Sequence, residues 1–196
     1  MKNDSTASVR VAAFLATIAL ALATPVALAA LAVGAPAPDF TAQAALGGKT
    51  FTFSLAEALK KGPVVLYFYP KAFTKGCTIE AHNFAEATEK FQALGATLIG
   101  MSNDDIETLK DFSVKECRNK FAVAADAGAR VMKQYDAAMF LLPDRANRIS
   151  YVISPEGKVL YSYESLSPDN HVENTLKAVR DWRAAITSQP DRRGSY

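Results

Sequence analysis

A cysteine and a threonine that precedes it by three residues are the best candidates for chemistry in this 196-residue chain. Cys77 closes the stretch Pro70-Lys71-Ala72-Phe73-Thr74-Lys75-Gly76-Cys77, which follows an apolar run at residues 64–69. We expect a buried strand over that run and a helix that begins near Cys77. A helix N-terminus offers unpaired N–H groups and partial positive charge, which favour the nucleophilic thiolate. The residues therefore predict a reactive thiol.

The side chains around this cysteine suit a peroxide ligand. Thr74 is close enough in a tight turn for its hydroxyl to meet the sulfur of Cys77. A hydroxyl can donate to a thiolate and accept from a peroxide O–H. Pro70 can wall one side of the pocket without adding a competing donor. This spacing favours reduction of a peroxide by a thiol.

The elements that position these residues alternate between strand and helix. We expect strands at 50–53, 64–69, 96–101, 121–125, 148–153 and 159–163, and helices at 54–61, 77–94, 104–119, 128–135 and after Pro168. Ser54 and Glu57 form a capping box for the first of these helices. The order predicts one α/β domain at residues 30–188, a central mixed sheet with helices on both faces.

The two ends of the chain differ from this pattern. Residues 11–22 are almost continuously apolar, and Ala27-Leu28-Ala29 has the small residues of a cleavage site. We interpret residues 1–29 as a signal peptide; the alternative is an uncleaved membrane anchor. The prediction is export, with a periplasmic location in a Gram-negative host and no stable membrane association after cleavage. The polar residues 189–196 are expected to be a disordered tail.

Charge and cysteine content narrow the function classes. The formal net charge is +2 and no block of like charge occurs, so nothing indicates a nucleic-acid partner. The absence of a Cys-x-x-Cys pair argues against a thioredoxin-type disulfide reductase. His82 and His171 are far apart in sequence and are poor candidates for metal ligands.

The pattern strand, Pro-x-x-x-Thr-x-x-Cys, helix resembles the active-site motif of peroxiredoxins. Residues 67–74 and 76–81 are similar to the peroxiredoxin Q, or bacterioferritin comigratory protein, branch of the AhpC/TSA-like proteins. Residues 35–40 resemble the opening of that family, and 148–157 resemble its arginine strand. The resemblance implies a thioredoxin-like fold and a monomeric thiol-specific peroxidase. It would reduce hydrogen peroxide and organic hydroperoxides without metal or cofactor, and a thioredoxin-like dithiol would recycle it.

The same resemblance assigns a role to each matching residue. Cys77 would be the peroxidatic nucleophile, Thr74 would hold the peroxide and Pro70 would shield the site. Arg148 would lie over the sulfur and polarise the peroxide, and Glu80 would orient that arginine. Two alternatives stay open: Glu80 as an exposed carboxylate at the helix start, and Arg148 as a surface cation.

The chain departs from the family at the resolving cysteine. Many peroxiredoxin Q proteins have it five residues after the peroxidatic one, where this chain has His82. Other members use a cysteine on the helix expected at 104–119, about a turn earlier than Cys117, near Ser113. The resemblance thus implies a Cys77–Cys117 disulfide as catalytic intermediate, after local unwinding. The alternatives are an external thiol as resolver and an inert, buried Cys117.

A second function class is compatible with the same fold. An exported thioredoxin-fold binding or chaperone protein could keep the cysteine without peroxidase activity. A copper-delivery protein of related fold would need paired cysteines and a partner histidine that the sequence lacks.

Overall fold

The computed structural model of the chain describes residues 30–188. The predicted leader, 1–29, and the predicted tail, 189–196, lie outside the described residues. Within residues 30–188, no helix combines the length and the apolar character needed to cross a membrane.

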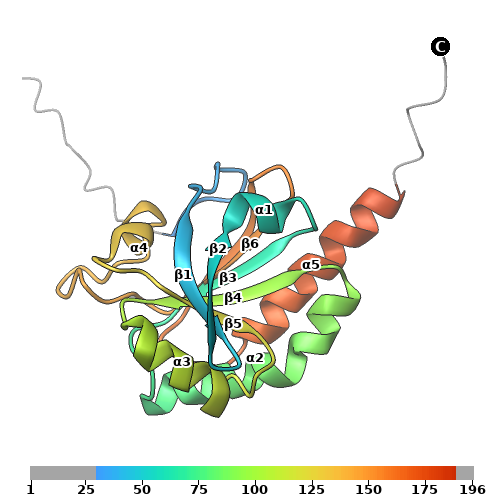
Figure 1. Cartoon of the computed structure of the whole chain (residues 1–196). Helices are drawn as coiled ribbons and strands as arrows, with labels where there is room; N and C mark the ends of the chain where they lie inside the picture. The colour runs from blue at the N-terminus through green and yellow to red at the C-terminus, as the bar shows by residue number, and fades with distance from the viewer. Residues whose placement is uncertain (1–29, 189–196) are drawn as a thin grey trace, which may run out of the picture.

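The described residues form one seven-stranded sheet, shown in Figure 1, in the order β2-β1-β5-β4-β3-β6-β7. The strands are β1 (Thr41–Leu46), β2 (Lys49–Ser54), β3 (Val64–Phe68), β4 (Thr97–Ser102), β5 (Ala122–Ala125), β6 (Ile149–Ile153) and β7 (Val159–Glu164). Strands β3, β4 and β5 are parallel to one another, and the other neighbours pair antiparallel. The predicted mixed sheet is confirmed. Strand β3 is buried along its whole length, as its continuous apolar sequence predicts.

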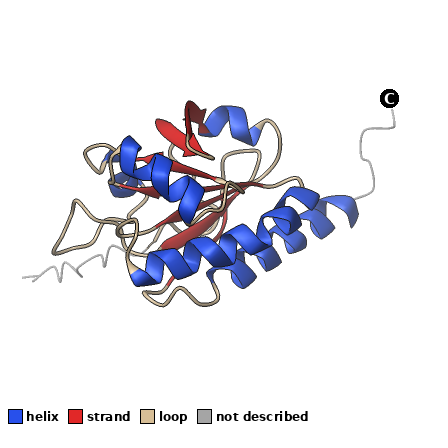
Figure 2. Cartoon of the chain, turned by 60° about the horizontal axis from the view of Figure 1, so that its bottom comes forward, coloured by secondary structure: helices blue, strands red, loops and turns tan. Residues whose placement is uncertain are grey.

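Helices cover both faces of this sheet. They are α1 (Leu55–Leu59), α2 (Lys75–Ala93), α3 (Ile106–Lys115), α4 (Arg130–Gln134) and α5 (His171–Ser188). Helices α2, α3 and α5 contribute to the core on one face, and α1 and α4 contribute to the core on the other. Figure 2 shows α2 and α5 side by side across the sheet. The predicted arrangement of helices on both faces is therefore confirmed.

Helix α1 and strand β1, both near the N-terminal end of the described residues, differ in how well the sequence predicts them. Ser54 caps α1 as predicted, because its Oγ accepts from the backbone N–H of Glu57 at 3.3 Å. Strand β1 was not predicted, since the alanine-rich sequence of residues 41–46 has no strand pattern of its own. It pairs with β2 through a turn at Gly47 and Gly48, whose φ angles of 56° and 76° need glycine.

The helix expected at residues 104–119 is shorter than predicted at both ends. It begins after Asp105, whose side chain accepts from the N–H of Thr108 at 2.8 Å, so Asp105 is the N-cap. It ends at Lys115, and Arg118 and Asn119 take left-handed backbone angles with φ of 52° and 58°. These angles turn the chain toward β5 and cannot continue a right-handed helix. Cys117 therefore lies in the α3–β5 connection and not on the helix.

Gly100 in β4 offers a direct test of the core. A Cβ at this residue would lie 2.7 Å from the ring of Tyr67, its partner on β3. We expect Gly100→Ala to lower the free energy of unfolding by about 1–3 kcal/mol, the usual cost of overpacking. Denaturant unfolding measures it, with Thr97→Ala at the half-buried start of β4 as a control of smaller effect. An unchanged unfolding midpoint for Gly100→Ala would contradict this packing.

Candidate active site

Cys77 lies in the first turn of α2, just beyond the end of β3. Its side chain is only 2% exposed. The N–H of Thr78 already bonds the carbonyl of Thr74 at 2.9 Å, so the N–H groups of residues 75–77 are those without a partner inside the helix. These groups and the helix dipole place the sulfur in a positive local field, as expected from the sequence.

The loop between β3 and α2 is held in place by an aspartate from the next strand. Asp104, just after β4, accepts from the backbone N–H of Ala72 at 2.7 Å and from the hydroxyl of Ser102 at 2.8 Å. Phe73 takes a left-handed φ of 61°, and its ring contacts Phe112 edge-on with centroids 5.2 Å apart. Strained residues of this kind occur where the surrounding structure fixes a loop. The sequence analysis placed Asp104 only at the start of the helix expected at 104–119 and missed this contact.

Thr74 and Pro70 border the same loop. The hydroxyl of Thr74 donates to the carbonyl of Lys71 at 2.9 Å, instead of toward the sulfur of Cys77. Its lone pairs can still accept from a ligand, and the side chain is exposed. Pro70 is half-buried and borders a depression of about 140 Å³ that Asn103, Asp104, Asp144 and Arg145 also line. Cys77 is not among the lining residues of this depression.

Arg148 lies directly before β6 and reaches the sulfur from a position 71 residues later in the chain. Its Nη2 lies 3.5 Å from Cys77 Sγ, its Nη1 donates to Glu80 Oε2, and its Nε donates to the carbonyl of Leu166 at 3.0 Å. The guanidinium is thus held on three sides and is 5% exposed. A Cβ at Gly76 would lie 2.9 Å from Nη2, so the missing side chain there lets the arginine approach this closely. Arg148 is therefore not a surface cation.

Glu80, one helical turn after Cys77, is fully buried and is not an exposed carboxylate. Burial raises the pKa of Glu80 to about 8, although the neighbouring Arg148 opposes the rise. Its second oxygen, Oε1, has no hydrogen-bond partner among the described residues. Nδ1 of His171 lies 3.6 Å from Oε1.

His171 is a buried site residue that sequence reasoning missed. It is the first residue of α5, and its side chain is fully buried against the sheet. The sequence analysis considered it only as a metal ligand, for which it is a poor candidate. Its spacing carried a signal, because His171 precedes the buried residues Thr175 and Val179 by four and eight positions.

Cys117 lies in the same buried cluster as Cys77, among the rings of Tyr67, Tyr69 and Phe112. Both cysteines are free thiols. Burial raises the pKa of Cys117 well above its usual value, and the charge of Glu116 adds to the rise. In this conformation Cys117 is an unreactive thiol, because the thiolate is the attacking species.

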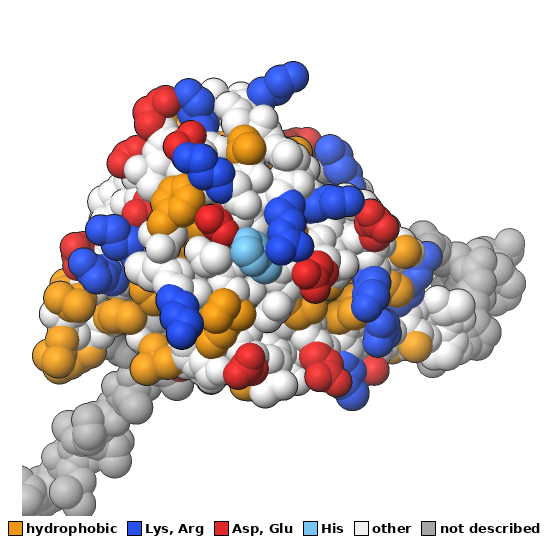
Figure 3. Space-filling model, turned by 90° about the horizontal axis from the view of Figure 1, so that it is seen from below, with side chains coloured by type: hydrophobic (Ala, Val, Ile, Leu, Met, Phe, Trp, Pro, Cys, Tyr) orange, Lys and Arg blue, Asp and Glu red, His pale blue; other side chains and the backbone are white. Residues whose placement is uncertain are grey.

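Three polar side-chain pairs join α2 to the segment that carries Cys117, and we call them the clamp. They are His82 Nε2 with Glu116 Oε2 at 2.7 Å, Glu86 with Arg118 at 3.2 Å and Glu89 with Lys120 at 2.9 Å. Figure 3 views the molecule from below, where acidic and basic side chains surround a histidine. The clamp therefore holds residues 116–120 against α2, and it includes the histidine at the position of the missing cysteine.

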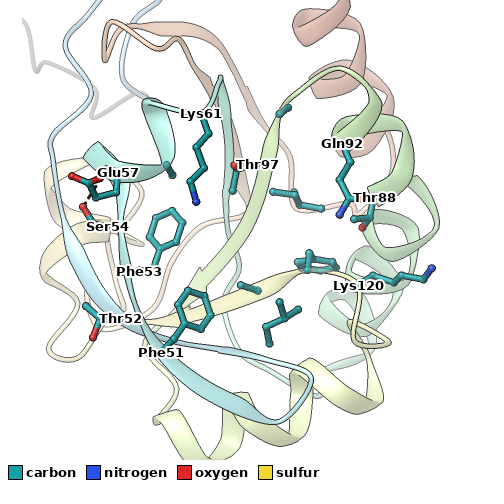
Figure 4. A pocket seen from close by; sticks show the side chains of 16 residues that line it. Phe51, Thr52, Phe53, Ser54, Glu57, Lys61, Thr88, Gln92, Thr97 and Lys120 are labelled. Atoms are coloured by element: carbon teal, nitrogen blue, oxygen red, sulfur yellow. Dashed lines mark hydrogen bonds between the residues drawn. The ribbon is translucent and has the colours of Figure 1, made fainter.

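A cavity of about 430 Å³ lies elsewhere, between the β1–β2 hairpin and α2 (Figure 4). Phe51, Phe53, Lys61, Gln92 and Lys120 are among the side chains around it. Neither cysteine nor Arg148 lines it, so it does not belong to the thiol site. Within residues 30–188 no group of three or more His, Cys, Asp and Glu side chains could hold a metal ion.

Comparison with known proteins agrees with this geometry. Residues 33–162 match the model of the AhpC/TSA family. The chain is 36% identical over 149 residues to "Peroxiredoxin Q, chloroplastic" of Triticum aestivum, a match over 76% of this chain and 66% of the relative. It is 33% identical to the protein of the same name from Arabidopsis thaliana, over 75% of this chain and 66% of the relative. The chain thus spans just under two thirds of the length of these relatives.

Solved structures show the same likeness. Peroxidoxin BcpB of Mycobacterium tuberculosis matches with a TM-score of 0.69 at 30% identity, over 76% of this chain and 96% of that chain. Peroxiredoxin Q of Xanthomonas campestris matches with a TM-score of 0.63 at 26% identity, over 72% of this chain and 90% of that chain. The predicted thioredoxin-like fold and the resemblance to the peroxiredoxin Q branch are confirmed. With its thiol, its buried arginine and these relatives, the chain belongs to the AhpC/TSA family.

Proposed function

We propose that the chain is a thiol peroxidase that reduces hydrogen peroxide and organic hydroperoxides at Cys77. The observation that carries the proposal is the guanidinium of Arg148, which lies 3.5 Å from Cys77 Sγ while Glu80 and the Leu166 carbonyl hold it. A buried cation with fixed donors favours the thiolate and can bind a peroxide oxygen. A binding protein without chemistry would not need such a contact.

In the proposed reaction, the thiolate of Cys77 attacks one oxygen of the peroxide and the O–O bond breaks. Sulfur is oxidised to the sulfenic acid, and the leaving hydroxide or alkoxide takes up a proton to become water or alcohol. Arg148 stabilises the negative charge that develops on the leaving oxygen. Thr74 accepts the peroxide O–H, since its own proton is donated to Lys71, and Pro70 limits access of water.

Cys117 is the proposed resolving residue, because it is the only other cysteine in the sequence. Its thiol condenses with the sulfenic acid, so that an S–S bond forms and water leaves. A dithiol of thioredoxin type then reduces the disulfide by exchange. Cys117 already lies outside regular helix, so only the first turn of α2 has to unwind, while residues 116–120 leave the core.

We also propose that the protein is exported and that it is a monomer. Residues 1–29 remain the predicted export signal, and an oxidising compartment would suit a disulfide-forming enzyme. The likeness to peroxiredoxin Q proteins supports the reductant class.

Substitution of each cysteine separates attack from resolution. Cys77→Ser should abolish peroxide consumption, because the nucleophile is lost. Cys117→Ser should consume about one equivalent of peroxide per chain in the absence of dithiol and stop at a trappable sulfenic acid. Wild type should instead form an intramolecular disulfide, read by mass spectrometry of peptides. Peroxide consumption by Cys77→Ser would refute the peroxidase, and a disulfide between two chains would refute Cys117 as the internal resolver.

The clamp should set the rate of resolution. Glu116→Gln weakens the contact with His82 and removes the charge that disfavours the Cys117 thiolate. We expect disulfide formation to accelerate up to about fivefold, since partly exposed pairs contribute about 0.2–1 kcal/mol. Stopped-flow measurement after one equivalent of peroxide reads this rate. Lys177→Gln, which breaks a pair with Asp181 inside α5, is the matched control and should leave the rate unchanged. A slower or unchanged rate in Glu116→Gln would contradict a restraining clamp.

A further inference from the structure

A buried hydroxyl near the two cysteines has no hydrogen-bond partner among the described residues. It is the phenol of Tyr67 on β3, whose side chain is 1% exposed. Two other buried tyrosines, Tyr135 and Tyr151, donate to the carbonyls of Pro38 and Tyr135 at 2.7 and 2.6 Å. An unpaired polar group that is buried raises the free energy of the folded state, so the phenol of Tyr67 needs an explanation.

Packing prevents this phenol from turning toward a partner. The ring of Tyr67 stacks on that of Phe84 on α2, with centroids 4.4 Å apart. Its hydroxyl lies over Gly100 on β4, where a Cβ would come within 2.8 Å of the oxygen. The glycine gives the hydroxyl room but no side chain that could accept from it. Tyr69 also lacks a recorded partner, but its ring stacks on Phe112 of α3, a helix that stays in place in the proposed resolution step.

The tip of the Tyr67 ring points toward the α3–β5 connection. Tyr67 pairs with Gly100 across β3 and β4, and Gly100 pairs with Val123 on β5. Because the hydroxyl lies over Gly100, the ring extends from β3 across β4. On that side the ring of Phe121, directly before β5, meets it edge-on with centroids 6.0 Å apart. The phenol is therefore directed at the segment that carries Cys117 and away from β6.

Movement of that segment changes the surroundings of the hydroxyl. Cys117 and Tyr67 belong to one buried cluster. Burial raises the pKa of Tyr67, and the neighbouring Cys117 adds to the rise, so the phenol remains a neutral O–H donor. When residues 116–120 leave their place in the proposed resolution step, water reaches this donor. Phe84, well beyond the first turn of α2, keeps the ring where it is. The cost of the unpaired hydroxyl is thus present only while the segment is closed.

We propose that the hydroxyl of Tyr67 is a built-in destabilising group that favours release of the Cys117 segment. It penalises the closed form, where it is unpaired and away from water, and spares the open form, where it is hydrated. The effect opposes the clamp, which holds the same segment closed. The inference rests on the proposed resolving role of Cys117 for its purpose, but the opening also occurs in the unreacted protein and can be measured there.

Tyr67→Phe in a Cys77→Ser background gives the first arm of the test. Cys117 is then the only thiol, and because it is buried, iodoacetamide reaches it only when the segment opens. At low reagent concentration the labelling rate follows the open fraction. Phenylalanine keeps the stack and removes the unpaired group, so we expect labelling of Cys117 to slow about fivefold or more, which corresponds to about 1 kcal/mol. Mass spectrometry against time reads the rate, and the melting temperature should stay equal or rise.

Tyr151→Phe in the same background is the matched control. It removes a buried hydroxyl that does have a partner, the carbonyl of Tyr135, and leaves that carbonyl unpaired. Its melting temperature should therefore fall, and labelling of Cys117 should not slow. Equal or faster labelling, a lower melting temperature or failure to fold in Tyr67→Phe would overturn the proposal, since the hydroxyl would then not disfavour the closed form.

The same variant connects the opening to the reaction. With Cys77 restored, Tyr67→Phe should slow formation of the Cys77–Cys117 disulfide after one equivalent of peroxide by a similar factor. An unchanged rate beside slowed labelling would contradict a part for Tyr67 in resolution. Absence of peroxide consumption by wild type would refute the proposed function alone, because the labelling arm needs no peroxide.

Discussion

Burial of the guanidinium of Arg148 is the interaction on which the site depends. A charge removed from water is tolerated only when its hydrogen bonds are satisfied. Here the three partners come from two segments, namely Glu80 and Cys77 on α2, and the carbonyl of Leu166 after β7. Arg148, directly before β6, is therefore bonded both to the start of α2 and to the segment that follows β7. Loss of any one partner would leave a buried polar or charged group of this site without its hydrogen-bond partner.

The sheet brings these segments together. Strands β3 and β6 pair antiparallel with Phe68 opposite Ile149, so the end of β3 lies beside the start of β6. Arg148 consequently emerges next to the loop that leads to Cys77. Strand β4 runs parallel to β3 and ends at the same edge, which places Asp104 where it can hold Ala72. The site thus occupies one edge of the sheet, where two strands end and a third begins.

A second constraint acts on Cys117. The residue is buried among aromatic rings, where its thiol is protected, and the clamp holds its segment against α2. The same features that stabilise the reduced protein would oppose the resolution step proposed for Cys117. Surface pairs of modest energy can be broken at little cost, whereas the Arg148 contacts cannot. In the proposed resolution step, residues 116–120 would therefore leave their place against α2 more readily than the Arg148 contacts would break.

The sequence predicted those parts of the molecule that local pattern determines. The apolar run of β3, the helix after Cys77 and the cap at Ser54 were all found as expected. The end of α3 was not, because left-handed angles at Arg118 and Asn119 reflect the path to β5 and not local preference. Strand β1 exists through its partners on both sides, since its alanines have little strand tendency.

Local sequence pattern likewise predicts only some of the residues of the site. Cys77, Glu80 and Arg148 could be placed in one site through their resemblance to a motif. Asp104 and His171 make contacts across the fold, with Ala72 and Ser150 respectively, which no spacing in the chain encodes. Their importance follows from burial and from the groups they face.

The central claim is that Arg148 makes a buried Cys77 a reactive thiolate, and direct titration of that thiolate tests it. The measurement is ultraviolet thiolate absorbance against pH in the Cys117→Ser protein, with Arg148 intact and with Arg148→Met. The account predicts that thiolate appears at clearly higher pH once the guanidinium is removed, with a parallel loss of peroxide reactivity at neutral pH. Superimposable titrations and equal peroxide rates in the two folded proteins would contradict it.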